Sequence, residues 1–546
     1  MSTCTINPPN TYSMAPYNGV WSKELAAHLL RRTTLGPNQT QIDNVFADGV
    51  DLSVDNILQT NISPDEPITW HPDETVALQG ETWVDKFMTP DPLLEDQTNG
   101  ARARSLYSWT VGRMNKEQLS TANITEKMVF FWQNHFGVEQ VQDDRINYDY
   151  FRTLEANAIG NFKTIVENIT INGAMMQFLD TASNTKWNPN ENYARELLEL
   201  YSIGKGIQTG PGDYSNFTED DILSGARILT GWKVRESMSS TANPYVEYDA
   251  NHHDTDPKQL SYHFNYMTLY NDDANEYKNF IAAIFQKEET AYHICRKLYR
   301  YFVSTEITQQ IENTVIDTMA QTLISNNYEI RPVLAELFKS EHFYDSTIIG
   351  SHLKSPYEFI FSILNPTLSF PQHNDEGNNV IWNRLYSAAR SMDQNWYGPP
   401  SVAGWPAYYV KPGYMQLWLN SATIDRRFWL VNLLTEHSTG ISDDITGTVY
   451  SFKIDALAFV DQLQTPSDGV AVIEQMCDLF FSRPLLQTKK DRLLNILANF
   501  LPAFEWTLQY NQYLTNTHDP ILREPVKQRV EAVLSEIFKL PEFQSC

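Results

Sequence analysis

The chain has 546 residues, of which 42% are hydrophobic and 12% aromatic, a balance that supports a large buried core and argues against long disordered segments. Its formal net charge is −26 and its pI is about 4.8. Such an acidic surface repels nucleic-acid phosphates and anionic lipid, so we expect no nucleic-acid partner. No stretch approaches the roughly 18 apolar residues that a spanning helix needs, so we also expect no membrane insertion.

The first twenty residues and the cysteines bear on the cellular compartment. Residues 1–20 are rich in Pro, Asn, Thr and Tyr, which predicts an extended arm. They contain neither Lys nor Arg and no continuous apolar run, so they do not resemble a secretory signal. The four cysteines form no CxxC pair, which fits a reducing compartment or a large exported protein. We therefore expect a cytoplasmic chain, or one exported with a partner that carries the signal.

Helical periodicity begins near residue 21 and covers most of the chain. Ser22 is the expected N-cap of a first helix that ends at Gly36. We divide the chain into the arm (1–20), an N-terminal helical region (21–290) and a C-terminal helical region (291–546). Further helices are predicted at about 100–118, 122–136, 144–159, 161–170, 190–203 and 218–231, and again after residue 273.

Two stretches depart from this helical pattern. Residues 233–272 contain "YVEYDANHHDTDPKQLSYHF", whose short alternating runs predict a small β-hairpin or long loop near 244–265. Residues 394–413 are too rich in Gly and Pro for regular structure, but two tryptophans predict that they are packed. The expected fold class is therefore mainly α, a large multi-helix globular fold with a minor β element.

The C-terminal region contains a weak internal repeat, which we place at 291–344 and 473–544. "ICRKLYRYFVS" leads to "LAELFKSEHF" in the first segment, and "QMCDLFFSRPL" leads to "LSEIFKLPEF" in the second. Two related helical units would explain this order, and so would chance similarity between amphipathic helices.

The stretch "NPNENYARELLELYSIG", residues 188–204, carries four charges in barely two turns. On a helix with 100° per residue, Glu191, Arg195 and Glu199 are spaced i, i+4, i+8 and lie opposite the apolar face. We expect an exposed ladder of ion pairs, each worth about 0.3–0.5 kcal/mol. Three of the four charges therefore have a structural explanation.

Glu196 is the fourth charge, and it borders the apolar stripe beside Leu200. A carboxylate in that position must find a partner or change its pKa. We therefore predict that Glu196 is largely buried while Glu191 and Glu199 are mostly exposed. It would serve as a hydrogen-bonding hub or as a ligand of the site. The expected partners are His135, Arg227 and Lys258.

Two further segments hold groups that could ligate a metal or transfer protons. His135 ends the apolar run "EKMVFFWQNHFG", residues 126–137, and is either a satisfied core histidine or an acid–base or metal-binding group. The segment "NHHDTDPK", residues 251–258, brings His253 and Asp254 together, and is either a self-capping turn or a metal loop. The chain contains no HExxH, GxSxG or GxGxxG motif, so the sequence supports neither a zincin, a serine hydrolase nor a dinucleotide site.

Several blocks together resemble a large bacterial family known as domain of unknown function 1800, in the family's order from about residue 22 to the C-terminus. The family often shows "FWHNHF", and Gln133 replaces its first His here, which weakens a two-His metal site on this helix. The blocks that carry the resemblance are "AAHLLRRTTLGP", "EKMVFFWQNHFG", "NPNENYARELLELYSIG", "FTEDDILSGARILTGW", "HHDTDPK", "ICRKLYRYFVS", "KSPYEFI" and "GPPSVAGWPA".

The resemblance implies no established activity, but it implies a companion. Such families are accompanied by a protein of the domain of unknown function 1501 family (DUF1501), which resembles the alkaline phosphatase superfamily and is often exported by the twin-arginine route. The first hypothesis is therefore a helical scaffold or binding protein that acts with a phosphatase- or sulfatase-like partner on cell-surface or extracellular material.

The second hypothesis is a metal-dependent hydrolase or other enzyme that uses a divalent metal. Its metal ligands would be His135, Glu196, His253 and Asp254. Its acid–base and electrophilic groups would be Glu196, His135, Arg195, Arg227 and Lys258. The first hypothesis is favoured because every one of these candidates also has a structural explanation.

Overall fold

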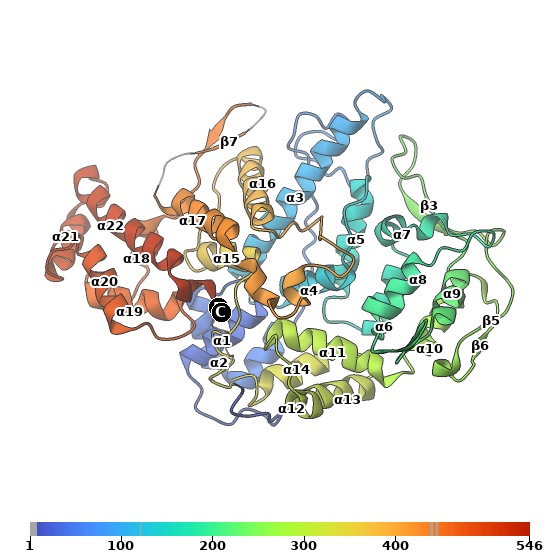
Figure 1. Cartoon of the computed structure of the whole chain (residues 1–546). Helices are drawn as coiled ribbons and strands as arrows, with labels where there is room; N and C mark the ends of the chain where they lie inside the picture. The colour runs from blue at the N-terminus through green and yellow to red at the C-terminus, as the bar shows by residue number, and fades with distance from the viewer. Residues whose placement is uncertain (1–7, 121, 437–439, 444–445) are drawn as a thin grey trace.

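The structure is a computed structural model that describes residues 8–120, 122–436, 440–443 and 446–546. Figure 1 shows helices throughout the molecule, and the strands of the described ranges pair only as two-stranded antiparallel sheets. The expected mainly α fold class is confirmed. Within these ranges no helix is long and apolar enough to cross a membrane.

The helices follow one another from the first predicted N-cap to the end of the chain. The Ser22 side chain accepts a hydrogen bond from the Leu25 N–H at 3.3 Å, which confirms it as the first N-cap. The helices are α1 Lys23–Thr33, α2 Gln39–Ile57, α3 Glu95–Ser120, α4 Thr125–Phe136, α5 Asp144–Ala156, α6 Phe162–Thr170, α7 Gly173–Phe178, α8 Asn192–Glu196, α9 Glu219–Ile228, α10 Glu276–Ile284, α11 Glu288–Phe302, α12 Gln309–Ile311, α13 Asp317–Ser325, α14 Ile330–Lys339, α15 Pro356–Leu364, α16 Asp375–Ser391, α17 Ser421–Thr435, α18 Ala456–Asp461, α19 Gly469–Phe480, α20 Gln487–Leu497, α21 Phe504–Thr515 and α22 Pro520–Lys539.

The β element is wider than the predicted range of 244–265, because the partner strands of both hairpins lie outside it. Trp232 pairs with Tyr248 in one hairpin, and Lys258 pairs with Leu269 in the next. The strands are β1 Gln208–Gly210, β2 Asp213–Tyr214, β3 Trp232–Arg235, β4 Tyr245–Tyr248, β5 Lys258–Gln259, β6 Thr268–Leu269, β7 Ile441–Ser442 and β8 Val449–Tyr450.

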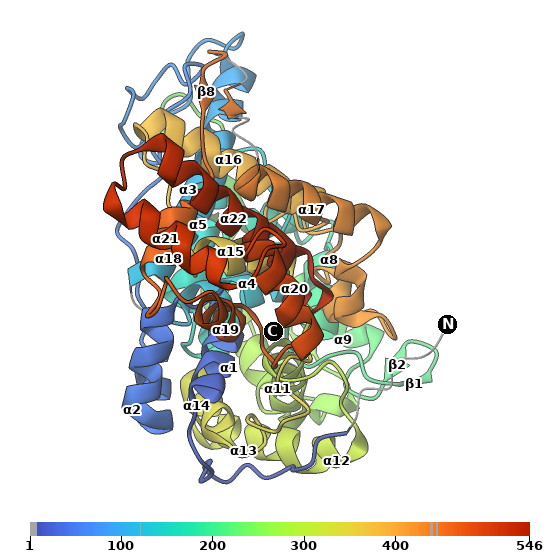
Figure 2. The same cartoon turned by 90° about the vertical axis from the view of Figure 1, so that its left-hand side faces the viewer.

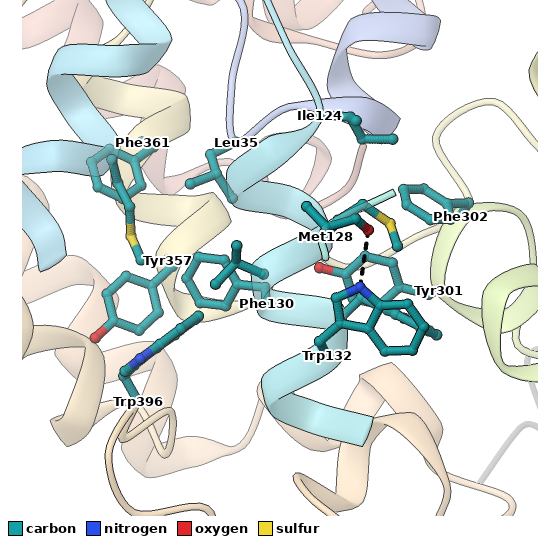
Figure 3. Close-up of a cluster of buried hydrophobic side chains, with 14 of the residues drawn as sticks. Leu35, Ile124, Met128, Phe130, Trp132, Tyr301, Phe302, Tyr357, Phe361 and Trp396 are labelled. Carbon is teal, nitrogen blue, oxygen red and sulfur yellow. Dashed lines mark hydrogen bonds between the residues drawn. The ribbon is translucent and has the colours of Figure 1, made fainter. Parts of the chain in front are cut away.

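Helix α4 runs through the centre of the core and is buried on nearly every side. In Figure 3, Phe130 lies against Trp396, with the ring centroids 4.3 Å apart and the rings nearly perpendicular. On another side of the helix the Trp132 indole N–H donates to the Ala158 carbonyl at 2.9 Å. A helix that is buried on nearly every side belongs in the interior of a large domain. Trp396 and Trp405 are 1% exposed, so the predicted Gly- and Pro-rich segment 394–413 is indeed packed.

The predicted arm, residues 1–20, lies partly outside the described residues, which begin at residue 8. From there the chain runs extended along the segment that follows α14. The Tyr17 N–H donates to the Lys339 carbonyl at 2.7 Å, and the His342 N–H donates to the Ser13 carbonyl at 3.0 Å. These hydrogen bonds fix the arm to the core ahead of α1.

The two segments with related sequences share a packing motif of three phenylalanines. In each segment one Phe ends the first helix, one lies near the end of the last helix, and one follows that helix. The first two rings are 5.1 Å apart in both segments, and the last two are 5.2 Å and 4.9 Å apart. The relationship between 291–344 and 473–544 stays a prediction, which this likeness favours. The two sets are Phe302, Phe338 and Phe343, and Phe480, Phe538 and Phe543.

Candidate functional site

The stretch that follows α8 continues as a π-helix over Leu197–Tyr201 rather than as a regular α-helix. We call it the π-turn. Single π-turns within helices are often found at functional sites, and the last carbonyls of any helix lack intrahelical partners. The chain leaves this turn through Gly204, whose φ of +78° places it in the left-handed region. The π-turn therefore presents backbone acceptors to the neighbouring helices.

Three basic side chains from two helices bind these acceptors. His135 of α4 places Nε2 3.1 Å from the Tyr201 carbonyl. From α11, Lys297 Nζ lies 2.9 Å and His293 Nε2 lies 3.0 Å from the Leu200 carbonyl. Lys297 Nζ also lies 3.0 Å from His135 Nδ1, so the three groups form one connected cluster around the π-turn.

The electrostatics of this cluster are unusual because none of its basic groups has an acidic partner among the residues that the structure describes. Lys297 forms no ion pair within the described part of the chain. Burial, with a smaller contribution from the Arg300 charge, lowers the pKa of Lys297 to about 7. Burial and the Lys297 charge lower the pKa of His293 to about 3 and hold that of His135 well below its usual value. Near neutral pH the cluster holds neutral imidazoles beside an amine that can lose its proton, a combination suited to proton transfer.

The predicted environment of Glu196 is wrong. Glu191, Glu196 and Glu199 all have intermediate exposure, and the Glu199 side chain is only 17% exposed. The π-turn that begins directly after Glu196 changes the angle per residue, so Glu199 and Leu200 do not lie where a regular helical wheel places them relative to Glu196. Glu196 hydrogen-bonds to none of its expected partners and forms no ion pair with any described residue. Burial, with the nearby Glu199 charge, raises its pKa.

The predicted ion-pair ladder is confirmed. Arg195 lies 2.9 Å from Glu191 and 3.7 Å from Glu199, and it also forms a pair with Glu219 of α9 at 2.8 Å. All four side chains are partly exposed, so these pairs add little stability. Arg195 thus ties the opening of α8 to α9 and stands apart from the basic cluster at the π-turn.

His253 and Lys258 belong to a separate buried cluster centred on Glu276 of α10. Glu276 Oε2 lies 2.7 Å from His253 Nε2, and its Oε1 lies 2.8 Å from Lys258 Nζ. His253 Nδ1 faces the Thr230 carbonyl at 2.9 Å. Both ring nitrogens of His253 are therefore engaged with oxygens, and neither is free for a metal ion.

Asp254 and Arg227 pair with each other at the edge of this cluster. Arg227 Nε donates to Asp254 Oδ2 at 2.7 Å and Nη2 donates to Oδ1 at 3.2 Å. This bidentate pair lowers the pKa of Asp254 against the opposing effect of burial, and raises that of Arg227. The Asp254 carboxylate is therefore already bound by the Arg227 guanidinium, as in a structural ion pair.

The structure therefore separates the predicted site residues into three groups. His135 joins the π-turn cluster, and Arg195 joins the ladder beside Glu196. The remaining four lie around Glu276, with His253 and Lys258 paired to Glu276 and Arg227 paired to Asp254. Within the described ranges no three His, Cys, Asp or Glu side chains are grouped so as to hold a metal ion. Sequence reasoning missed Lys297, which lies in the block "ICRKLYRYFVS", and Glu276, for which the sequence offers no local motif.

The loop that follows residue 394 closes over the C-terminal end of α4. The Trp405 N–H donates to Asn134 Oδ1 at 2.9 Å, and a Cβ at Gly404 would come within 2.2 Å of the Asn134 carbonyl. A Cβ at Gly137 would come within 2.5 Å of the Val402 carbonyl. Four of the sequence blocks, those of α4, the π-turn, α11 and this loop, consequently meet at one end of α4.

Comparison with known proteins gives one match. A family described as "Protein of unknown function (DUF1800)" matches residues 28–545, nearly the whole chain. No curated protein matches the chain. No solved structure matches it either.

Proposed function

We propose that the chain, which belongs to the DUF1800 family of proteins of unknown function, is a helical binding protein that docks a companion enzyme. The companion would be the phosphatase- or sulfatase-like protein of the DUF1501 family, and the pair would act on cell-surface or extracellular material. In this proposal the chain supplies a rigid surface, and the companion supplies the chemistry.

One observation carries this proposal, an apolar surface on the last helical unit. Phe500, Leu501, Phe504 and Leu508 are 79%, 48%, 64% and 51% exposed, and we call them the α21 patch. Phe504 and Leu508 are one helical turn apart on α21, and Phe500 and Leu501 lie in the turn before this helix. In Figures 1 and 2, α21 lies at the periphery of the molecule. Clustered exposed aromatic and aliphatic side chains of this kind mark protein–protein contact surfaces.

The charge around the α21 patch favours an acidic partner surface. Residues 487–530 contain six Lys and Arg against four Asp and Glu, whereas the whole chain has 41 against 67. The net charge of −26 makes two copies of the chain repel each other at long range, whereas a locally basic unit attracts an acidic surface on a partner. The occupant we assign is therefore the companion, bound through an acidic region with an apolar centre.

The test is association of the two purified proteins, measured by light scattering and calorimetry. We expect a stable complex that buries at least about 1,200 Å² in total, and at least about tenfold weaker binding for Phe504→Asp. Leu93→Asp is the matched control, because Leu93 is 86% exposed outside the patch. No association, or equal losses in both variants, would refute the proposal. Metal analysis of the purified chain separates it from a metal-dependent enzyme.

A further inference from the structure

A cavity of about 540 Å³ lies between the first helices and the last helical unit. Its walls come from α1 and α2 on one side, and from α18, α19 and the segment after α19 on the other. Figure 2 shows α19 beside α1, although the two helices are far apart in the sequence. The volume falls within the range of small-molecule sites, about 300–1,000 Å³.

Arg31 of α1 lines this cavity and is only 8% exposed. Its Nη2 donates to the Asp478 carbonyl at 3.1 Å and to the Leu479 carbonyl at 2.9 Å. Among the described residues, Nε and Nη1 of Arg31 have no hydrogen-bond partner, and no carboxylate lies within ion-pair distance of the guanidinium. The side chain is thus held in place by two backbone acceptors, while its remaining donors are unused.

A buried guanidinium without a counter-ion is costly, because burial removes hydration that the two backbone acceptors of Arg31 replace only in part. Burial lowers the pKa of Arg31 to about 10, against the opposing effects of Cys546, Glu24 and Asp478. The group therefore keeps its charge at neutral pH. An anion in the cavity would supply both the missing charge and the missing acceptors.

The other cations of the cavity already have partners. Lys23 pairs with Asp43 at 2.5 Å, and Lys490 pairs with Glu474. Arg483 donates to backbone carbonyls, with Nε 2.7 Å from that of Ile349. Arg31 is consequently the buried cation of this cavity that lacks a charged partner among the described residues.

Two features of the cavity lining limit the kind of anion that it can bind. Glu24 and Asp478 also line the cavity, are exposed, and form no ion pair with a described residue, so their charges disfavour a dianion. Phe459, Leu463 and Phe481 supply an apolar wall. The complementary ligand carries one negative charge and an apolar body.

We propose that this cavity binds a small organic carboxylate, whose carboxylate accepts hydrogen bonds from the free donors of Arg31 and whose apolar body contacts Phe459 and Phe481. This site is independent of the α21 patch, so either proposal can fail without the other. The carboxylate fits better than a phosphate ester because a monoanion avoids repulsion from the two acids.

The first experiment is calorimetric titration of the full chain with 3-phenylpropionate, with its neutral analogue 3-phenylpropanol and with phenethyl phosphate. We expect 3-phenylpropionate to bind at least about tenfold more tightly than the alcohol, since a charge-assisted hydrogen bond is lost with the neutral head group. The phosphate ester should bind more weakly than the carboxylate. Absence of binding by 3-phenylpropionate at millimolar concentration, or tighter binding of the phosphate ester, would overturn the assignment.

The second experiment uses two variants that should change the affinity for 3-phenylpropionate in opposite directions. Arg31→Met should weaken 3-phenylpropionate binding at least about tenfold. Arg492→Met is its control, since that side chain is 66% exposed and does not line the cavity. Asp478→Asn, an exposed position that should not disturb folding, should tighten binding severalfold by removing a repelling charge. If neither Asp478→Asn nor Arg31→Met changes the affinity for 3-phenylpropionate, the binding of a carboxylate at Arg31 is refuted.

Discussion

Lys297 and His135 lie 162 positions apart in the sequence, yet Lys297 Nζ is 3.0 Å from His135 Nδ1. This contact joins α11 to α4 at the π-turn. Since Lys297 donates to Nδ1, the His135 proton is on Nε2, where it is donated to the Tyr201 carbonyl. The contact therefore fixes the tautomer of His135 and holds a partly buried amine that has no counter-ion among the described residues.

Replacement of this amine should make the protein less sensitive to pH. The pKa of Lys297 is lowered from its ordinary value of 10.5 to about 7, so the unfolded chain binds a proton between these values that the native chain does not. The free energy of unfolding of the native protein should therefore increase as pH rises from about 7 towards 10. Below pH 7 the full free-energy cost of burying the charged Lys297 amine should apply.

Lys297→Met should therefore be most stabilising relative to the native protein at or below pH 7, with an advantage that shrinks towards pH 10. Urea unfolding of both proteins across this range measures the difference. Lys278→Met is a control, because Lys278 forms no ion pair with a described residue and its exposed side chain stands outside the cluster. A difference that does not change with pH would contradict the assigned environment of Lys297.

Gly204 should tolerate no side chain. Its φ is +78°, and a Cβ there would lie 2.5 Å from His293 Nδ1. Gly204→Ala combines backbone strain of about 1–2 kcal/mol with displacement of His293 from the Leu200 carbonyl. Gly80→Ala carries the same backbone strain, at φ +83°, but its Cβ would meet no atom within 4 Å. A larger loss of unfolding free energy in Gly204→Ala than in Gly80→Ala confirms the contact.

Glu276 should contribute more to stability than any residue of the ladder. It is fully buried between His253 and Lys258, so Glu276→Ala leaves two buried partners unpaired, at a cost of about 3–5 kcal/mol. Glu191→Ala, in the partly exposed ladder, should cost less than about 1 kcal/mol. Chemical denaturation compares the two variants. Equal costs would mean that the Glu276 cluster adds no stability of its own.

Glu196→Gln should be neutral or stabilising near pH 7, contrary to the expectation from the helical wheel. Burial raises the pKa of Glu196, and the carboxylate forms no hydrogen bond or ion pair with a described residue. Its charged form therefore costs free energy above the native pKa, and this cost vanishes as pH falls below the unfolded value. Melting midpoints of Glu196→Gln at pH 7 and pH 4 check this. Marked destabilisation at pH 7 would show that Glu196 has a partner.

The sequence by itself determined the features that depend on local periodicity and local chemistry. Ser22 capped the first helix, and Glu191, Arg195 and Glu199 formed the expected ladder. The Gly- and Pro-rich segment was packed as predicted, although it includes the short 3-10 helix Pro406–Tyr408. The mainly α fold class and the family followed from the same signals. Such properties are set within one or two helical turns, or by composition, so a single sequence contains them.

Only the tertiary structure decided which distant side chains meet. His135 was predicted to join Glu196 or His253, but it contacts Lys297, and His253 contacts Glu276. Which buried polar side chains contact each other depends on how helices far apart in the sequence pack together. The periodicity of the sequence contains no information about this packing. The π-turn after Glu196 likewise arises where α4 and α11 supply donors to its carbonyls. The position of Arg31 beside an interhelical cavity has the same origin, because α1 and α19 approach each other only in the folded chain.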